Sequence, residues 1–271
     1  MKTFQNKVVW LTGASSGIGE ALAYALSGQH CKLILSSRNS AQLERVKRCC
    51  ENGGENIFIH PLDLTRTSEL KLKALEAWDY FGRIDYFIHN AGIAVRDLAV
   101  NTKPEIDREV METNYFGAVM LTKSILPAML ERKSGHIVAI SSLSGKYGVP
   151  RLSAYAASKH ALHGFFDSLR TEVAFMNLKV SIIVPGFINT PIASHALDGN
   201  GNSYNKNIRV NDTGINADVC AEKIMEAISK EKQEALIGGK EMLSVYLNRF
   251  FPKLFSRIIR NHPVRRLRLV E

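Results

Sequence analysis

Short apolar runs alternate with longer amphipathic segments along almost the whole chain, and this alternation limits the possible folds more than any other feature. The runs are rich in Val, Ile and Leu, as in strands buried on both faces, whereas the segments between them have helical spacing. Strands linked by right-handed helical crossovers predict an α/β fold, a three-layer, doubly wound (Rossmann-type) parallel sheet with its binding site at the carboxyl ends of the strands. The seven expected strands are 7–12, 31–36, 56–60, 84–89, 135–142, 180–184 and 234–237.

Length and composition favour one large domain. The chain has 271 residues, 45% of them hydrophobic, and no linker, repeat or low-complexity tract divides it. We expect a single domain over residues 1–239, which includes a lid at about 187–214, and a basic extension over residues 240–271. The first apolar run begins near residue 7 and no apolar run reaches about 18 residues, so we expect no signal peptide, no membrane anchor and a cytoplasmic location.

The four cysteines, Cys31, Cys49, Cys50 and Cys220, have no metal-ligand spacing. The adjacent pair Cys49 and Cys50 lies in a charged helical pattern, which is more typical of reduced thiols than of a disulfide framework. We therefore expect neither a disulfide nor a metal site.

The turn after the first apolar run is rich in glycine. It reads Thr-Gly-Ala-Ser-Ser-Gly-Ile-Gly over residues 12–19 and leads into a helical pattern at 18–26. Glycines let the backbone bend tightly and let a pyrophosphate approach the helix N-terminus, so the pattern favours a dinucleotide site over a purely structural turn. The candidate residues are Gly13, Ser15, Ser16, Gly17, Ile18 and Gly19.

The ends of the second and third strands supply further candidates. Ser37, Arg38 and Asn39 follow the second strand, where a dinucleotide fold meets the adenosine ribose. An arginine there suits the 2′-phosphate of NADP(H), whereas an acidic residue would suit NAD; the alternative is a surface arginine without a ligand. Asp63, followed by Leu64, is placed either to meet the adenine amino group or to cap a helix.

Two more turns follow strands that should end at the same edge of the sheet. The turn at 90–92 has small residues that leave room for a flat ligand, and an asparagine amide that can tie neighbouring strands together. The turn at 185–190 begins with Pro-Gly, which ends the strand, and contains a threonine that can bond a ligand amide. The candidate cofactor residues in these turns are Asn90, Ala91, Gly92, Pro185, Gly186, Ile188 and Thr190.

Ser142, Tyr155 and Lys159 have a spacing that carbonyl chemistry can use. Tyr155 and Lys159 lie four residues apart in a helical pattern at 154–175 and so share one helix face, while Ser142 ends a strand. Taken singly, each residue is more typical of packing or of a surface. Taken together, they support a hypothesis in which Tyr155 transfers a proton, Lys159 favours its phenolate and Ser142 bonds the substrate oxygen.

Asn114 and Gly117 are poor helix formers inside the helical pattern at 107–129. Their place mid-helix indicates a local bend, close packing or a site. Asn114 is therefore a further candidate site residue.

These motifs together, in this order, resemble the short-chain dehydrogenase/reductase family over roughly the first 240 residues. The resemblance implies an oxidoreductase whose catalytic residues are Asn114, Ser142, Tyr155 and Lys159. It also implies that Asn114 holds a water linking Lys159 to solvent, and that a homodimer or homotetramer forms through the Asn114 and Tyr155 helices. Within the family, residues 155–161 and the preceding serine-rich segment resemble the dehydrogenase/reductase member 7B group.

Apolar side chains around Ser142 and Tyr155 predict an apolar ketone or secondary alcohol as substrate, of steroid, retinoid or lipid type. A lid is expected from residues 193–214, which are rich in Asn, Gly, Ser and Asp. The alternatives are a 3-oxoacyl thioester reductase of lipid synthesis and a non-catalytic nucleotide-binding interaction protein. The candidate substrate residues are Ser142, Leu143, Tyr147, Val149, Leu152, Tyr155 and Phe187.

The positive charge is concentrated at the C-terminus. Residues 240–271 hold eight Lys and Arg residues and two glutamates, and so carry six of the nine net positive charges. An apolar pattern at 242–259 accompanies them, broken by Pro252. Two interpretations stay open: an extension that packs over the cleft or a neighbouring subunit, and an amphipathic segment that docks on anionic lipid. Nucleic-acid binding is not expected, because no fold signature accompanies the charges.

Overall fold

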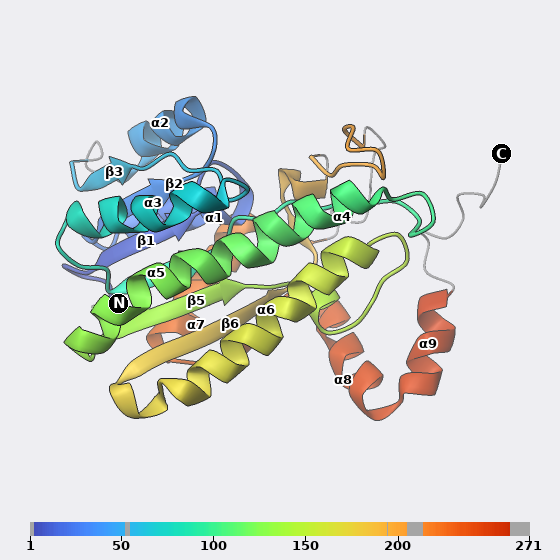
Figure 1. The fold of residues 1–271 in the computed structure, drawn as a ribbon. Helices are drawn as coiled ribbons and strands as arrows, with labels where there is room; N and C mark the ends of the chain where they lie inside the picture. Colours follow the sequence, from blue (N-terminus) through green and yellow to red (C-terminus); the bar gives the residue numbers. More distant parts are fainter. Residues whose placement is uncertain (1–2, 52–54, 194, 205–213, 261–271) are drawn as a thin grey trace.

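Seven parallel strands form the central sheet of the computed structural model, which describes residues 3–51, 55–193, 195–204 and 214–260 (Figure 1). The strand order is β3-β2-β1-β4-β5-β6-β9, and every neighbouring pair is parallel, which confirms the predicted doubly wound sheet. The order reverses between β1 and β4, and sheets of this kind bind their ligands in a crevice at the carboxyl ends of such strands. The strands are β1 (Val8–Thr12), β2 (Lys32–Ser36), β3 (Ile57–Ile59), β4 (Tyr86–His89), β5 (Gly135–Ile140), β6 (Leu178–Pro185) and β9 (Glu234–Ile237).

Helices cover both faces of the sheet and make two separate apolar cores. Successive strand residues point to opposite faces, so that Val9 and Leu11 pack in one core and Val8 and Trp10 in the other. The first core contains α1 (Gly17–Ser27), α2 (Ser40–Cys49) and α7 (Ala217–Ser229). The second contains α3 (Thr67–Asp79), α5 (Gly117–Arg132) and α6 (Ser153–Glu172), which lie in front of the sheet in Figure 1.

The helix expected at 107–129 is longer than predicted and is not uniform. It begins with α4 (Pro104–Met111), passes through a π-helical turn at Glu112–Phe116 and continues as α5 to Arg132. Gly117 follows the π turn at a close approach, since a Cβ there would lie 2.8 Å from the Cβ of Leu64. The two poor helix formers thus mark a local distortion and a tight packing contact, as their positions indicated.

The segment after β6 forms structure that the sequence analysis missed. β7 (Ile188–Asn189) pairs in parallel with β8 (Ile215–Asn216) beside the main sheet. Of the expected lid, residues 194 and 205–213 lie outside the described residues. Within the described part, Leu197 bridges Val95 and Ser203, which fastens this stretch to the segment after β4.

The C-terminal extension forms two helices beyond β9. A short 3-10 turn at Lys240–Met242 leads into α8 (Leu243–Phe250) and then α9 (Pro252–Arg260), so Pro252 begins the second helix. Figure 1 draws α8 and α9 as a V-shaped pair that projects from the carboxyl side of the sheet. None of the helices formed by the described residues is both long enough and apolar enough to cross a bilayer. All four cysteines are free thiols.

Candidate active site

The structure brings Ser142, Tyr155 and Lys159 together at the carboxyl end of β5. Ser142 comes two residues after this strand, and its hydroxyl hydrogen-bonds the phenol of Tyr155, which lies in the first turn of α6. One helical turn further on, the Lys159 ammonium lies 5.7 Å from the centroid of the Tyr155 ring. It donates a hydrogen bond to the carbonyl oxygen of Ile140, at 2.9 Å, which directs the lysine across the end of β5.

Burial governs the ionisation of both residues. It raises the pKa of Tyr155, and the hydrogen bond with Ser142 lowers it only in part. Burial also lowers the pKa of Lys159 to about 8, because removing an ammonium from water disfavours its charged form. Tyr155 is therefore a protonated phenol, which is a proton donor. The phenolate expected beside Lys159 and an oxidised nicotinamide stays a prediction.

Asn114 joins the site from the π-helical turn. Its side-chain oxygen accepts from the backbone N–H of Ile93 at 2.8 Å, and its amide donates to the Ile93 carbonyl at 2.9 Å and to Ser158 Oγ at 2.9 Å. A Cβ on Gly92 would lie 3.1 Å from the Asn114 oxygen and 3.5 Å from Lys159 Nζ. Asn114 thus connects the loop after β4 to the helix that carries Lys159.

The glycine turn is shaped by close backbone packing at the switch point of the sheet. Gly13 has a φ of +67°, and a Cβ there would lie 2.6 Å from the Cα of Ala91. A Cβ on Gly19 would overlap the Gly13 carbonyl oxygen. Gly17 has a φ of +58°, and its Cβ would lie 3.2 Å from the Cβ of Thr190, so two predicted cofactor segments face each other.

Asn90 ties neighbouring strands together, as its amide suggested. Its side chain donates to the carbonyl oxygen of Gly13 at 3.1 Å. The backbone N–H groups of Asn90 and Ala91 both lie 3.2 Å from Thr12 Oγ1. These bonds hold the loop after β4 against the glycine turn, on the side of the crevice nearest Lys159.

The turn and the first helix fit a dinucleotide. Ser16 is the N-cap of α1, and its side chain makes no capping hydrogen bond to the helix. The N-terminal amides of an eleven-residue helix then face the crevice with the positive end of its dipole, which suits a pyrophosphate. The residues present therefore fit a dinucleotide between the glycine turn and the Ser142, Tyr155 and Lys159 group.

The predicted adenosine end lies at the carboxyl ends of β2 and β3. Arg38 is exposed. Burial raises the pKa of Asp63, but the hydrogen bonds from Thr65 and then the charge of Arg38 lower it, and the net pKa is below the usual value. Asp63 accepts from the N–H and the hydroxyl of Thr65, at 3.0 and 2.8 Å. Asn39 serves as the N-cap of α2, where it accepts from Gln42 at 3.0 Å, so one of its two side-chain groups is engaged.

Arg45 is a residue near the site that sequence reasoning missed. It forms a paired ion bridge with Glu20, at 2.7 and 2.8 Å, and donates to the carbonyl oxygen of Ser15 at 3.3 Å. It thereby braces the glycine turn from α2. The signal for it was weak, because Arg45 and Glu20 lie 25 residues apart in two different helical patterns.

Some of the expected substrate residues lie on the loop after Ser142, and others are buried in the core. Leu143 is buried in the second core, and Leu152 is the N-cap of α6. Tyr147 lies on the loop after Ser142, where its hydroxyl is 2.6 Å from Ser244 Oγ and its ring is 4.7 Å from that of Phe255. The C-terminal helices therefore pack on the loop after Ser142.

The turn after β6 is also held by the C-terminal extension. Glu241 accepts from the backbone N–H groups of Phe187, at 3.1 Å, and Gly239, at 2.9 Å. A Cβ on Gly186 would overlap the Glu241 carboxylate, so Glu241 packs directly on this turn. Val149 is partly buried on the Tyr147 loop, and Ile188 is buried in the first core.

A sequence model of the short chain dehydrogenase family matches residues 7–200, more than two thirds of the chain. The chain belongs to the short-chain dehydrogenase/reductase family. It is 40% identical over 260 residues to a dehydrogenase/reductase SDR family protein 7-like of Anopheles gambiae, covering 94% of this chain and 82% of that one. It is 39% identical over 260 residues to the mouse dehydrogenase/reductase SDR family member 7B, covering 94% and 80%.

Solved structures of the family share the fold. A metagenomic short-chain oxidoreductase in complex with NADP matches with a TM-score of 0.72 and 26% identity, covering 87% of this chain and 98% of that one. A Burkholderia phymatum short chain dehydrogenase/reductase in complex with NAD matches with a TM-score of 0.82 and 22% identity, covering 94% and 96%. Family membership thus makes the chain an oxidoreductase with a nicotinamide cofactor, and similar folds take either NAD or NADP.

Proposed function

We propose that this chain is an NADP(H)-dependent oxidoreductase that interconverts a ketone and a secondary alcohol on an apolar substrate. The observation that carries the proposal is the hydrogen bond between the Tyr155 phenol and Ser142, with the Lys159 ammonium one helical turn away. A protonated, partly buried phenol beside a hydroxyl suits the reduction of a carbonyl oxygen, because both groups can donate hydrogen bonds to it.

In the reductive direction, Tyr155 gives its proton to the carbonyl oxygen as that oxygen gains negative charge. A nicotinamide cofactor, when bound, supplies the hydride that the carbonyl carbon accepts. Ser142 donates a hydrogen bond to the same oxygen. Lys159 stabilises the phenolate that Tyr155 becomes, and two of its three N–H donors are not used by the bond to Ile140.

The preference for NADP(H) is carried by Arg38. Its guanidinium is exposed at the carboxyl end of β2, beside Asp63 and close to the turn that holds Ser37. A guanidinium binds a phosphate through short, charge-assisted hydrogen bonds, and no acidic residue stands at positions 37–39 to bind a free 2′-hydroxyl instead.

The proposal is tested by a screen for NADPH oxidation with ketosteroids, retinoids, 3-oxoacyl thioesters and simple ketones. We expect turnover of an apolar ketone. We further expect Tyr155→Phe to lower kcat by about a hundredfold or more, because a proton donor in the transition state contributes roughly 10² to 10⁴. Preference for a 3-oxoacyl thioester would favour the lipid-synthesis alternative. Binding of NADPH without turnover of any carbonyl would favour the interaction protein.

The outer side of α8 and α9 is proposed to dock on an anionic lipid surface. The inner side of α8 bonds the Tyr147 loop through Ser244 and Asn248. On the opposite side, Tyr246 and Phe250 are 55% and 69% exposed. In α9, Leu254 and Ile258 are likewise exposed, one helical turn apart.

Charge supports this choice of partner. Residues 243–260 contain four basic side chains and no acidic one, and Lys253, Arg257 and Arg260 form one stripe of α9 beside the exposed apolar stripe. Apolar side chains flanked by cations are typical of helices that lie in a membrane interface. The homodimer or homotetramer and the cytoplasmic location stay predictions.

A further inference from the structure

A buried imidazole that the proposed mechanism does not use lies one helical turn beyond Lys159. His163 follows Tyr155 and Lys159 at four-residue spacing, so the three side chains share one face of α6. His163 is 9% exposed. Its Nε2 lies 3.0 Å from the hydroxyl of Ser141, the residue that precedes Ser142. The imidazole thus contacts the strand end that carries a proposed catalytic hydroxyl.

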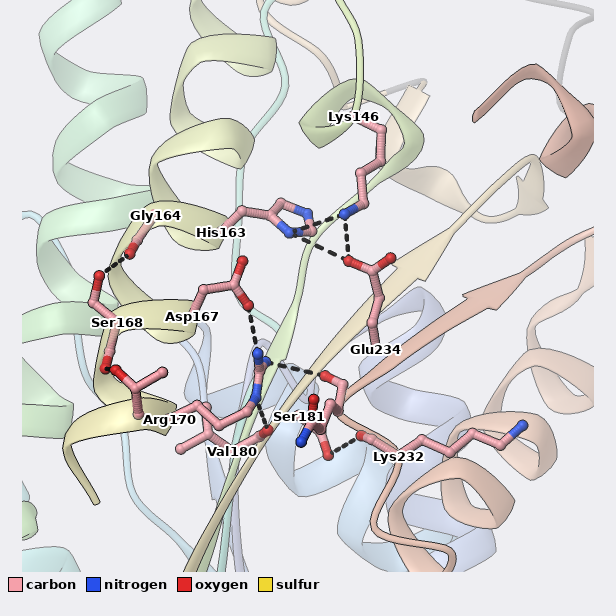
Figure 2. Close-up of polar contacts among 12 residues, drawn as sticks. Lys146, His163, Gly164, Asp167, Ser168, Arg170, Val180, Ser181, Lys232 and Glu234 are labelled. Carbon is pink, nitrogen blue, oxygen red and sulfur yellow. Dashed lines mark hydrogen bonds and ion pairs between the residues drawn. The ribbon is translucent and has the colours of Figure 1, made fainter. Parts of the chain in front are cut away.

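The other nitrogen of His163 meets a charged pair. Lys146 Nζ lies 3.4 Å from Nδ1, and the carboxylate of Glu234 hydrogen-bonds the same ammonium (Figure 2). Glu234 Oε2 is 3.6 Å from Nδ1. Lys146 belongs to the loop after Ser142 and Glu234 begins β9, so three separate segments converge on one imidazole.

The hydrogen bonds can run in one consistent direction. Burial, and then the charge of Lys146, lower the pKa of His163 to about 4, so the ring is neutral at physiological pH. An ammonium can only donate, which makes Nδ1 the acceptor and leaves the proton on Nε2 to be donated to Ser141. Ser141 in turn donates to the carbonyl oxygen of Lys159 at 3.3 Å. The order is therefore Lys146, His163, Ser141, Lys159.

The backbone of the loop after Ser142 packs closely against these hydrogen-bonded groups. A Cβ on Gly145 would overlap Ser141 Oγ and would lie 2.9 Å from the Lys159 carbonyl oxygen and 3.1 Å from the His163 ring. Further along α6, Arg170 donates to the carbonyl oxygen of Val180 at 2.8 Å (Figure 2). It also donates to the carbonyl oxygen of Gln233 at 3.1 Å. The helix is thus fixed against β6 and the start of β9, and a shift of the imidazole would move the loop.

We propose that His163 is a positioning residue, whose imidazole holds Ser141 and Lys146 so that the Ser142 hydroxyl and the loop at 143–147 face Tyr155. Its catalytic consequence rests on the proposed function, whereas the positioning itself does not. His163 acts through Ser141 and does not touch the reacting groups, so it is distinct from Ser142, Tyr155 and Lys159.

The positioning is tested without substrate by hydrogen exchange of the ligand-free protein, followed by mass spectrometry of peptides that cover residues 141–147. We expect His163→Leu to speed exchange there by about tenfold or more. His163→Gln should give a smaller increase, because an amide keeps one donor and one acceptor. The matched control is His160→Leu, since His160 is exposed on the same helix and its Nδ1 lies 2.8 Å from the carbonyl oxygen of Ala156 in that helix. Equal exchange in His163→Leu and His160→Leu would overturn the proposal.

The consequence for catalysis is measured separately. For a ketone found in the screen, we expect His163→Leu to lower kcat/KM by about tenfold while the Kd for NADPH is unchanged, with partial recovery in His163→Gln. A lower melting temperature with unchanged loop exchange and unchanged kcat/KM per folded molecule would show a merely structural role. Should His163→Leu fail to fold, Lys146→Met tests the same bonds from their partly exposed end. A wild-type protein without activity would refute the proposed function, and the exchange result would still decide the positioning.

Discussion

Tyr155 and Lys159 lie four residues apart on one helix, yet burial sets their pKa values more than either residue sets the other's. Both charged forms lose hydration on burial, so the pKa of the phenol rises and that of the ammonium falls. The spacing in the sequence gives the distance between the two groups but not their exposure. Spacing alone therefore does not specify the direction in which either pKa shifts.

Arg38 permits a sharp test of cofactor preference at the scale of one residue. We expect Arg38→Ala to weaken NADPH binding by about tenfold to a hundredfold, since a hydrogen bond to a charged group contributes roughly 1.5–3 kcal/mol. NADH binding should change little, because NADH has no 2′-phosphate. Fluorescence titration of both cofactors measures the two constants.

Arg48 provides the matched control for this substitution. It is an exposed arginine in the last turn of α2, away from the glycine turn. Arg48→Ala should leave both constants within about twofold of wild type. Tighter binding of NADH than of NADPH by the wild-type protein would refute the role of Arg38.

At the scale of elements, the π-helical turn at Glu112–Phe116 shows how a local irregularity serves the site. A regular helix would carry Asn114 past the loop after β4 at a different angle, whereas the π turn lets its amide bond Ile93 and Ser158 together. Two weak helix formers in the sequence indicated that something was unusual there. The particular partners depend on α6, which lies more than 35 residues further along the chain.

The helices α8 and α9 give a second test at this scale. We expect the protein to co-sediment with vesicles of phosphatidylcholine and phosphatidylserine, and to do so less at high salt because exposed charges are screened. Phe250→Ser with Leu254→Ser should lower the bound fraction several-fold, since two exposed apolar side chains no longer enter the interface. Vesicles of phosphatidylcholine alone should bind more weakly.

The control is Phe175→Ser, which removes an apolar side chain that is 98% exposed but lies after α6. It should sediment like wild type. Equal sedimentation of all three proteins would end the membrane proposal. Sedimentation velocity checks the rival explanation: a dimer that dissociates in the double variant, with no lipid binding, would mean that a second copy of the chain covers this surface.

At the scale of the whole molecule, the buried histidines predict how stability depends on pH. Burial lowers the pKa of His89 to about 3 and of His136 and His163 to about 4. Below pH 6.5 the unfolded chain binds protons that the folded protein does not. The stability that the neutral histidines contribute is therefore fully present above about pH 6.5, and it is lost as the pH falls towards their pKa values in the folded protein. Between pH 7 and pH 5 we expect each imidazole to lower the free energy of unfolding by on the order of 2 kcal/mol.

Urea denaturation at pH 7, 6 and 5 measures this loss. His136 offers a variant for the test, because it lies at the start of β5 with Ser181 as its partner at 2.8 Å, away from the site. In His136→Gln, the difference between pH 7 and pH 5 should shrink by on the order of 2 kcal/mol, the contribution of one imidazole. A free energy of unfolding that is the same at pH 5 and pH 7 would contradict the prediction.

The sequence by itself determined the layers, the order of alternation and which segments supply the candidate site. Apolar runs buried on both faces are typical of the strands of an inner parallel sheet. Glycines mark the turn at the switch point of the sheet, where no side chain fits, so one sequence is enough to predict both features. What only the tertiary structure decided were the contacts between distant segments: Arg45 on the glycine turn, His163 between Lys146 and Ser141, and Tyr147 against Phe255. Such contacts depend on the angle and distance between packed elements, which the periodicity of one segment does not specify. The same holds for pKa values, because burial belongs to the folded molecule and not to the residue.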